Sequence, residues 1–255
     1  VVHVSQEVDW DLEVGAIVRR TNELRGPAVL FENLKDYPKG YRIFGAPLAT
    51  YRRLAIAMGL APDTSIRGLH EEYEKRQKKP IKPTVVTNGP CKENIILGDD
   101  IDLYRFPAPT IHHGDGGRYM GTWHLVINKD PDSDWTNWGL YRMVIRDQRH
   151  LTGLIVHEIT QSGFIFFNKY EPQNKPMPIA IAIGADPLCT AQASDPIPMN
   201  LSEVDYAGGL RQEPVEIIKC ETNDIMVPAH SEIVIEGEIL PNIRVQEGPF
   251  GEYPG

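Results

Sequence analysis

The spacing of apolar positions divides the chain into an amino-terminal part with helical periodicity and a longer part with strand periodicity. In three stretches, apolar residues recur every three or four positions, which places them on one face of a helix. The predicted helices cover residues 9–24, 48–58 and 65–79. The first begins with Asp9 and Asp11, either of which can cap it.

Short runs of β-branched and aromatic residues predict strands, most of them after residue 119. The predicted strands cover residues 28–31, 41–44, 122–128, 138–145, 151–159, 178–183, 215–219 and 232–238. Helices followed by strands favour an α+β fold, with an amino-terminal α/β lobe and then a mostly antiparallel sheet or barrel. We place the two domains at 1–100 and 101–255.

Composition and charge narrow the classes of partner. The chain has 255 residues, of which 41% are hydrophobic and 24% charged, enough for a substantial core. The net charge of −9, without a basic block interleaved with aromatic residues, argues against nucleic acid. No apolar run approaches membrane-spanning length. The scattered Cys91, Cys189 and Cys220 form no CxxC motif and predict reduced thiols in a cytoplasmic protein.

The stretch that carries the most chemical information is 247–252, where Glu247 and Glu252 flank Gly-Pro-Phe-Gly. Proline and glycine predict a sharp bend that brings the two carboxylates into one space. With a cation nearby, one carboxylate stays charged and the other can hold a proton, which makes an acid/base pair. A solvated surface turn is the alternative reading of this segment taken alone.

Arg142 supplies a candidate cation, because its planar guanidinium can pair with a carboxylate through two donors. If Arg142 faces Glu247, the three side chains form a Glu-Arg-Glu chain in which Glu252 is free to exchange a proton. An ordinary edge-strand arginine is the alternative. Asn137 and Arg142 are five positions apart, so in one regular strand they point to opposite faces. For both to reach one site, Asn137 must precede the strand or a bulge must intervene.

Two further clusters carry potential metal ligands. Glu203 and Asp205 precede a Gly-Gly pair and offer oxygen atoms to a hard cation, although acids in the first turn of a helix have the same pattern. His112, His113 and Asp115 lie in the turn-rich loop 106–117. Their spacing matches no established zinc motif, so hydrogen-bonded loop residues are the favoured reading and a metal-dependent hydrolase the alternative.

In combination, these stretches resemble the UbiD-type decarboxylases. The matching motifs run in order along essentially the whole chain: Phe-Pro-x-Pro at 106–109, Asp-Gly-Gly-x-Tyr-x-Gly-Thr at 115–122, Asn-Trp-x-x-x-Arg at 137–142, Ser-Glu-x-x-x-Ala-Gly at 202–208 and Glu-Gly-Pro-Phe-Gly-Glu at 247–252. The Phe-Gly-Glu form of the acidic loop is closer to the ferulic acid and heteroaromatic acid members of that family.

The resemblance implies a split β-barrel flavin-binding domain holding prenylated FMN, with Mn²⁺ or another divalent metal and K⁺ at its phosphate. It implies Glu252, Arg142 and Glu247 as the catalytic set, and metal ligation by Asn137 and Glu203. Where the family has a third, histidine ligand, this chain has Thr160 or, one position on, Gln161, and we take Gln161 as the ligand. The implied cofactor-binding residues are Asn137, Trp138, Gly139, Leu140, Tyr141, Arg142, Thr160, Gln161 and Glu203.

The activity implied by the resemblance is the reversible, non-oxidative decarboxylation of an aromatic, heteroaromatic or α,β-unsaturated carboxylic acid, with Glu252 as proton donor. The implied partners are the acid, CO₂, a second copy of the chain or more, and a flavin prenyltransferase that supplies the cofactor. A non-catalytic flavin-binding or assembly subunit is the alternative. Members of the family are much longer than 255 residues, so we expect further chain beyond Gly255 or a partner covering that end.

Overall fold

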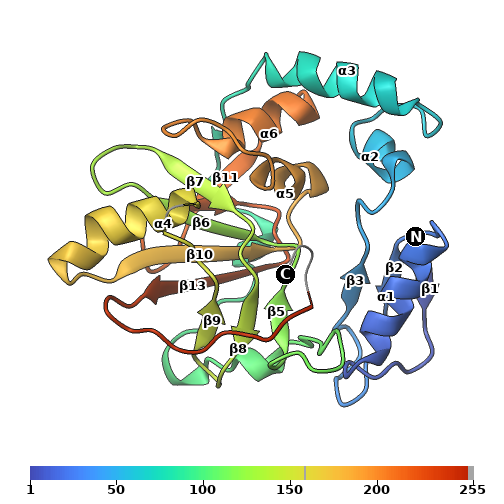
Figure 1. Cartoon of the computed structure of the whole chain (residues 1–255), viewed down its shortest axis with the longest axis horizontal. Coiled ribbons are helices and arrows are strands. Elements are labelled where there is room, and N and C mark those ends of the chain that lie inside the picture. The colour runs from blue at the N-terminus through green and yellow to red at the C-terminus, as the bar shows by residue number, and fades with distance from the viewer. Residues whose placement is uncertain (158, 252–255) are drawn as a thin grey trace.

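The computed structural model describes residues 1–157 and 159–251 and has an α+β fold (Figure 1). Its helices are α1 (Glu13–Glu23), α2 (Tyr51–Ala57), α3 (Ile66–Gln77), α4 (Gln161–Ile165), α5 (Pro187–Ala193) and α6 (Glu203–Arg211), with a π-helical turn, η4 (Phe166–Tyr170), continuing α4. Its strands are β1 (Val2–Val4), β2 (Val29–Phe31), β3 (Ile43–Gly45), β4 (Thr84–Val85), β5 (Tyr119–Gly121), β6 (Leu125–Lys129), β7 (Thr136–Gly139), β8 (Met143–Ile145), β9 (Leu151–Gly153), β10 (Met177–Ile183), β11 (Glu216–Lys219), β12 (Met226–Pro228) and β13 (Ile233–Ile239).

The amino-terminal sheet has the order β1-β2-β3, with β1 parallel and β3 antiparallel to β2. Helix α1 packs on it through a small core that includes Val14 and Phe31. The helix begins later than the sequence predicts, because Leu12 takes a positive φ of 68° and no side chain caps it. Asp9 instead accepts a hydrogen bond from the backbone N–H of Asp11, 2.9 Å away.

The larger part of the chain is built on the antiparallel sheet β13-β10-β6-β7. One face, with Leu125 and Trp138, packs against α5 and α6, and the other, with Val126 and Ile181, packs against α4 and η4. The continuous apolar run of β10 follows from this arrangement, since both of its faces are covered. The smaller sheets are β12-β11-β4 and β5-β8-β9, and among the described residues no sheet closes into a barrel.

The predicted strand 138–145 is two strands in two sheets. β7 ends at Gly139, and β8 begins at Met143 and pairs with β5 and β9. The three residues between them turn the chain from one sheet into the next. This break is the physical reason that Asn137 and Arg142 escape the alternation of a single regular strand.

The sequence pattern predicted neither α4 nor α5, and it offered α6 only as the alternative reading of Glu203 and Asp205. The predicted strand 151–159 is a strand only at β9 and is followed by α4, whose N-cap is Thr160. Helix α5 carries an Asp186 cap and Pro187 at its first position, a signal that was available in the sequence. No helix of the described residues is both long and apolar enough to cross a membrane.

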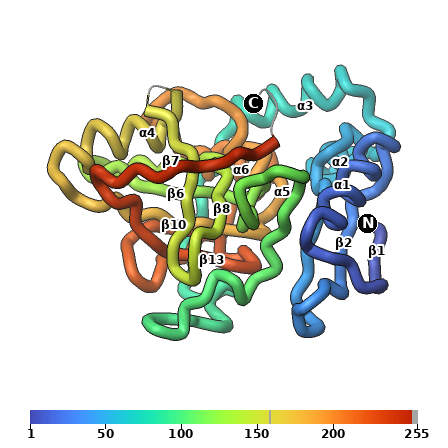
Figure 2. The backbone as a smooth tube through the Cα atoms, turned by 60° about the horizontal axis from the view of Figure 1, so that its bottom comes forward, coloured from blue at the N-terminus to red at the C-terminus, as the bar shows by residue number. Residues whose placement is uncertain are grey.

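The terminal segment returns across the molecule after β13. In Figures 1 and 2 it is the red trace that passes β9 and β8 towards the carboxyl end. Arg244 fixes its path by pairing with Glu171 at 2.8 Å and by lying over the rings of Phe166 and Phe167. This path carries Glu247 to the start of β8.

Gly15 provides a test of how α1 docks on the rest of the chain. A Cβ at Gly15 would lie 2.0 Å from the carbonyl oxygen of Ile111. Gly15→Ala should therefore lower the free energy of unfolding by about 1–3 kcal/mol, the usual cost of overpacking. Gly237→Ala is the matched control, because a Cβ there meets nothing within 4 Å. Urea unfolding measures both, and a Gly15→Ala protein as stable as the wild type would contradict this packing.

Candidate active site

Arg142 and Glu247 meet in a two-pronged ion pair. Arg142 donates from Nη2 to Glu247 Oε2 at 2.8 Å and from Nε to Oε1 at 3.1 Å. Both side chains are largely buried, 16% and 8% exposed. A planar guanidinium that meets a carboxylate through two donors fixes its orientation as well as its charge. The contact that the sequence raised as a condition is therefore present.

Tyr119 and Phe250 complete the surroundings of Glu247. The Tyr119 hydroxyl donates to Glu247 Oε1 at 3.1 Å. Burial, together with the charge of Glu247, raises the pKa of Tyr119 to about 12, so the phenol stays protonated and remains a donor. The Phe250 ring lies 4.2 Å from the Tyr119 ring, with the Arg142 guanidinium 5.5 Å from its centroid. Neither aromatic residue had been assigned a role from the sequence.

Loop 106–117 holds the acidic segment in place. The Asp115 carboxylate accepts hydrogen bonds from the backbone N–H groups of His112 at 2.8 Å and of Gly251 at 3.3 Å. The backbone N–H of Gly116 donates to the Pro249 carbonyl at 2.7 Å. A Cβ at Gly116 would lie 2.3 Å from the Gly248 carbonyl oxygen, so this close approach requires glycine.

These contacts give His112 and Asp115 a structural role. Within residues 1–157 and 159–251, no three His, Cys, Asp or Glu side chains gather as metal ligands, and this includes His112, His113 and Asp115. The alternative of a metal-dependent hydrolase at this loop therefore finds no support. Glu252, the other predicted acid, lies outside the described residues.

The predicted metal ligands Asn137 and Glu203 lie at the outer edge of the large sheet. β7 is an edge strand, and α4 and α6 both approach it (Figure 1). The buried Asn137 donates from Nδ2 to Ser162 Oγ at 2.8 Å, and Glu203 Oε2 accepts from the backbone N–H of Trp138 at 2.8 Å. Burial raises the pKa of Glu203 to about 7 despite this hydrogen bond. Burial of a carboxylate is costly unless a cation or a proton accompanies it.

The side chains of Thr160 and Gln161 differ in whether they offer an oxygen atom to a cation. The Thr160 hydroxyl is committed as the cap of α4: it accepts from the backbone N–H of Gly163 at 3.0 Å and donates to the Val156 carbonyl at 2.8 Å. Gln161 donates from Nε2 to the Ile197 carbonyl at 2.7 Å, whereas its buried Oε1 has no hydrogen-bond partner. Of the two, Gln161 has the oxygen that a cation can take.

A chain of contacts connects the three candidate ligands. Gln161 is followed by Ser162, which bonds Asn137, and Asn137 is followed by Trp138, which bonds Glu203. Their donor atoms would be two amide oxygens and a carboxylate, a set that suits hard divalent cations such as Mg²⁺ and Mn²⁺.

The remaining predicted cofactor contacts lie between the ion pair and this edge. Trp138 is buried in the core between β6 and α6, so only its backbone faces the edge. Gly139 is buried against the Tyr141 ring. A Cβ at Gly139 would lie 2.5 Å from the nearest carbon atom of that ring. Leu140 and Tyr141 are half-buried in the turn that leads to Arg142.

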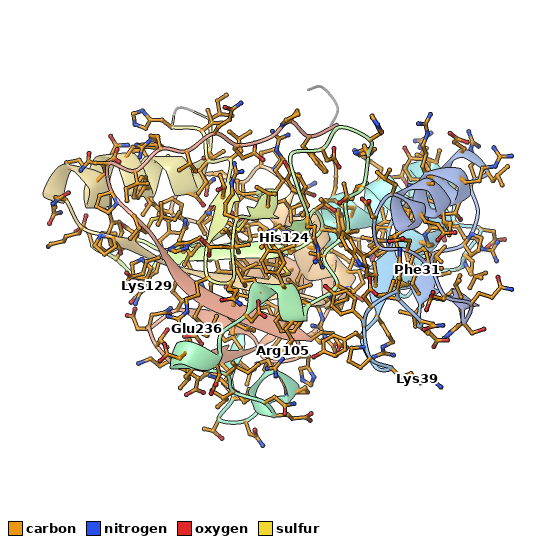
Figure 3. The ribbon with its side chains drawn as sticks, turned by 90° about the horizontal axis from the view of Figure 1, so that it is seen from below. Phe31, Lys39, Arg105, His124, Lys129 and Glu236 are labelled. Atoms are coloured by element: carbon orange, nitrogen blue, oxygen red, sulfur yellow. The ribbon has the colours of Figure 1, made fainter. Side chains whose placement is uncertain are left out.

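His124 is a buried polar residue that the sequence did not single out. It lies in the middle of the molecule (Figure 3) and is 2% exposed. Burial lowers the pKa of His124 to about 4, so the ring is neutral at physiological pH.

Comparison with known proteins places the chain in a family. Residues 82–255 match the 3-octaprenyl-4-hydroxybenzoate carboxy-lyase Rift-related domain (UbiD), and residues 1–73 match the N-terminal domain of the same carboxy-lyase. The chain belongs to the UbiD family. The resemblance seen in the sequence is thus confirmed.

Named relatives of this UbiD-family chain act on aromatic and heteroaromatic acids. Pyrrole-2-carboxylic acid decarboxylase of Pseudomonas aeruginosa is 40% identical, covering 100% of this chain and 52% of that protein. Vanillic acid decarboxylase of Sedimentibacter hydroxybenzoicus, in its closed form, has a TM-score of 0.94 at 35% identity, covering 99% of this chain and 54% of the other. An evolved dimeric form of the UbiD-class enzyme HmfF from Pelotomaculum thermopropionicum, in complex with prFMN, has a TM-score of 0.88 at 34% identity, covering 99% and 57%. The chain therefore spans about half the length of the relatives it matches.

His124 predicts a pH dependence of stability. Its pKa is about 4 when folded and about 6.5 when unfolded, so between these values the unfolded state binds more protons. Stability is therefore lost as the pH falls from 6.5 towards 4, by at most about 2 kcal/mol between pH 7.5 and 5. Urea unfolding at both pH values should show this loss reduced in His124→Gln.

The raised pKa of Glu203 has the opposite effect, because it makes the folded protein more stable as the pH falls. Glu203 is present in both the wild type and His124→Gln, so the difference between the two proteins reports on His124. Replacement of the exposed His70 by Gln is the surface-histidine control with which the change in His124→Gln is compared. An equal pH dependence in wild type and His124→Gln would show that His124 is not a buried neutral histidine.

Proposed function

We propose that this chain is the prenylated-FMN-binding part of a decarboxylase that releases CO₂, reversibly and without oxidation, from an aromatic, heteroaromatic or α,β-unsaturated carboxylic acid. The observation that carries the proposal is the buried, two-pronged Arg142–Glu247 pair, held by Tyr119. Membership of the UbiD family and the decarboxylase relatives support it.

Within this proposal, Arg142 and Glu247 line one side of the reaction site. The guanidinium pairs with the Glu247 carboxylate through two donors, and the Tyr119 hydroxyl donates to the same carboxylate. Glu252, five positions further along, is assigned as the proton donor to the carbon that loses CO₂. A positioned acid of this kind contributes a factor of ~10²–10⁴ to the rate.

The described residues fit the implied cofactor. Gln161 Oε1 is a buried oxygen without a partner, and Glu203 is a buried carboxylate whose raised pKa marks an uncompensated charge. Asn137, Gln161 and Glu203 would hold a divalent cation, Mn²⁺ or Mg²⁺, and through it the flavin phosphate, with K⁺ as a second cation. When bound, the prenylated flavin supplies the electron sink for loss of CO₂. The protein orients the acid and moves the proton.

The proposal extends to organisation and partners. We propose a division into an amino-terminal lobe, 1–100, and a flavin-binding domain, 101–255, and assembly into a homodimer or larger oligomer. A flavin prenyltransferase supplies the cofactor, and the cytoplasm is the proposed location. The HmfF complex with prFMN supports the choice of flavin.

Arg142→Lys tests the central pair. Lysine keeps the charge but cannot span both oxygens of Glu247, so we expect the rate of CO₂ release to fall at least about tenfold, or ~1.4 kcal/mol of barrier. The assay uses protein produced together with a flavin prenyltransferase and a panel of aromatic and heteroaromatic acids. Arg149→Lys, at a surface pair with Asp99, is the control and should retain full activity.

Three outcomes separate the readings of this site. A loss in Arg142→Lys no larger than that in Arg149→Lys would remove Arg142 from the reaction site. Wild-type protein that binds flavin but releases no CO₂ from any acid would favour a non-catalytic flavin-binding subunit. Wild-type protein without flavin or turnover would refute the proposed function.

The metal assignment is tested with the apoprotein. Glu203→Gln and Gln161→Ala should each weaken Mn²⁺ binding by about tenfold or more, which is ~1.4 kcal/mol, in isothermal titration. Asp205→Asn, two residues further along α6 and paired with Lys82, and Thr160→Ser, which retains the α4 cap, should bind as the wild type does. Wild-type Mn²⁺ affinity in Gln161→Ala would remove Gln161 from the ligand set, and wild-type affinity in Glu203→Gln would remove Glu203.

A further inference from the structure

The helical segment α4–η4 is tied to the β6–β7 hairpin at both of its ends. At the near end, Ser162 of α4 accepts the hydrogen bond from Asn137 of β7. At the far end, Lys169 of η4 reaches Asp130, which directly follows β6. Seven positions separate Ser162 from Lys169, which in a helix is roughly 10 Å. The two ties therefore fix both the position and the direction of the segment.

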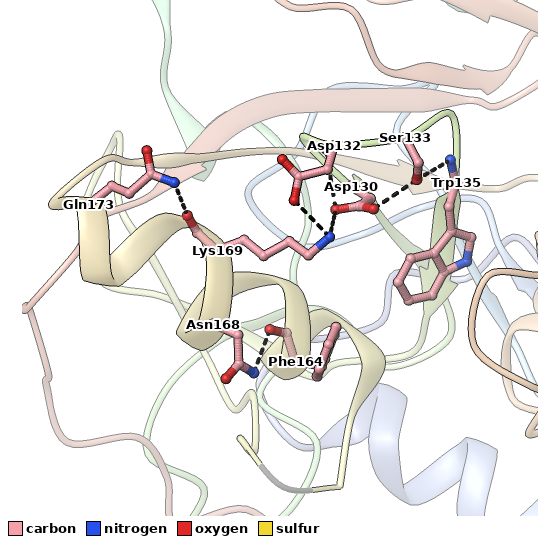
Figure 4. Close-up of polar contacts among 8 residues, drawn as sticks. All are labelled: Asp130, Asp132, Ser133, Trp135, Phe164, Asn168, Lys169 and Gln173. Carbon is pink, nitrogen blue, oxygen red and sulfur yellow. Dashed lines mark hydrogen bonds and ion pairs between the residues drawn. The ribbon is translucent and has the colours of Figure 1, made fainter.

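The far tie is a tight polar cluster, shown in Figure 4. Lys169 Nζ lies 2.5 Å from Asp130 Oδ1 and 3.0 Å from Asp132 Oδ2. The second oxygen of Asp130 accepts from the Ser133 hydroxyl at 2.7 Å, and Ser133 Oγ in turn accepts from the backbone N–H of Trp135 at 3.2 Å. The cluster thus reaches along the hairpin turn to the residue that precedes β7.

The cluster is more than a surface ion pair. The Asp130 side chain is only 5% exposed and that of Lys169 only 23%. Burial opposes ionisation of Asp130, yet the hydrogen bonds from Lys169 and Ser133 outweigh it and lower its pKa. The hydrogen bond to Asp130 raises the pKa of Lys169. Both groups are charged in the folded protein.

Apolar packing alone would leave the position of α4 along the strands loosely defined. Ile165 and Phe166 pack against the face of the sheet that contains Val126 and Met177, but apolar contact is non-directional. A π-helical turn often marks a functional site, and here it carries Lys169 to the hairpin. Ion pairs and hydrogen bonds have defined geometry, so they select one register of the helix on the hairpin.

We propose that Lys169 is a positioning residue: by pairing with Asp130 and Asp132 at the far end of the segment, it sets where the near end presents Gln161 to Asn137 and Glu203. The inference rests on the proposed metal-binding role of those three residues. Lys169 is not one of the three proposed ligands, and its ammonium pairs with Asp130 and Asp132 instead. Ligands displaced by a fraction of an ångström bind more weakly, which gives the pair its functional consequence.

The test compares Lys169→Met and Asp130→Asn with Lys175→Met. Lys175 is exposed, lies just beyond the same segment, and its ammonium donates to Gln173 Oε1 at 2.9 Å. The change to methionine keeps an unbranched apolar stem and removes the charge in both positions. In the folded apoprotein we expect Lys169→Met and Asp130→Asn to weaken Mn²⁺ binding about tenfold, the loss typical when a group supporting a metal ligand is removed. Lys175→Met should bind as the wild type does, and Lys169→Arg, which keeps the charge, should recover most of the affinity.

A second readout needs no metal. Hydrogen exchange followed by mass spectrometry should show faster exchange in Lys169→Met, and not in Lys175→Met, for peptides spanning 161–170 and 136–142. Wild-type Mn²⁺ affinity in a fully folded Lys169→Met protein would overturn the inference. If the wild type itself binds no Mn²⁺, the proposed metal site fails, and unchanged exchange in Lys169→Met would then overturn the positioning role as well.

Discussion

The candidate site depends on how the free edge of β7 is covered. An uncovered edge strand exposes unpaired backbone groups that invite pairing with another chain. Here the segment entering α6 lies along that edge: Leu201 O accepts from the Trp135 indole, and Glu203 Oε2 accepts from the backbone N–H of Trp138. The interaction that covers this edge therefore also places Glu203 at Trp138, the residue that follows Asn137. A buried carboxylate with a pKa near 7 is the energetic consequence.

The second constraint is loop 106–117, which is held between two parts of the chain. On one side it meets α1, where Leu12 N–H donates to the Thr110 carbonyl at 2.9 Å and Gly15 packs on Ile111. On the other side Asp115 and Gly116 bind the segment 248–251. Arg118, next to Tyr119, lies 4.1 Å from the centroid of the Trp10 ring. The amino-terminal part of the chain thereby supports the loop that holds the acidic segment next to Arg142.

Part of this arrangement could be read from the sequence. Helical and alternating periodicities predicted α1, α2, α3, β6, β10 and β13 to within a few residues, because each has one clear apolar face or a continuous apolar run. The Gly-Pro-Phe-Gly segment and Arg142 were identified because a sharp bend can bring two carboxylates together and a guanidinium can pair with one of them. Short elements such as α4 and the break between β7 and β8 were not predicted, since a three-residue turn leaves the apolar pattern almost unchanged.

The sequence by itself determined the α+β class, the main elements and the family, since local periodicity and ordered motifs depend only on the order of residues. Only the tertiary structure decided which polar groups meet. Tyr119 reaches Glu247 across 128 positions, and Glu203 reaches the Trp138 backbone across 65. It also decided that the buried Oε1 of Gln161 is left without a hydrogen-bond partner. The positions of Gln161 and Glu203 come from the packing of α4 and α6 at the edge of one sheet, and the Tyr119 contact comes from the path of the terminal segment after β13. No local pattern of residues encodes such long-range geometry.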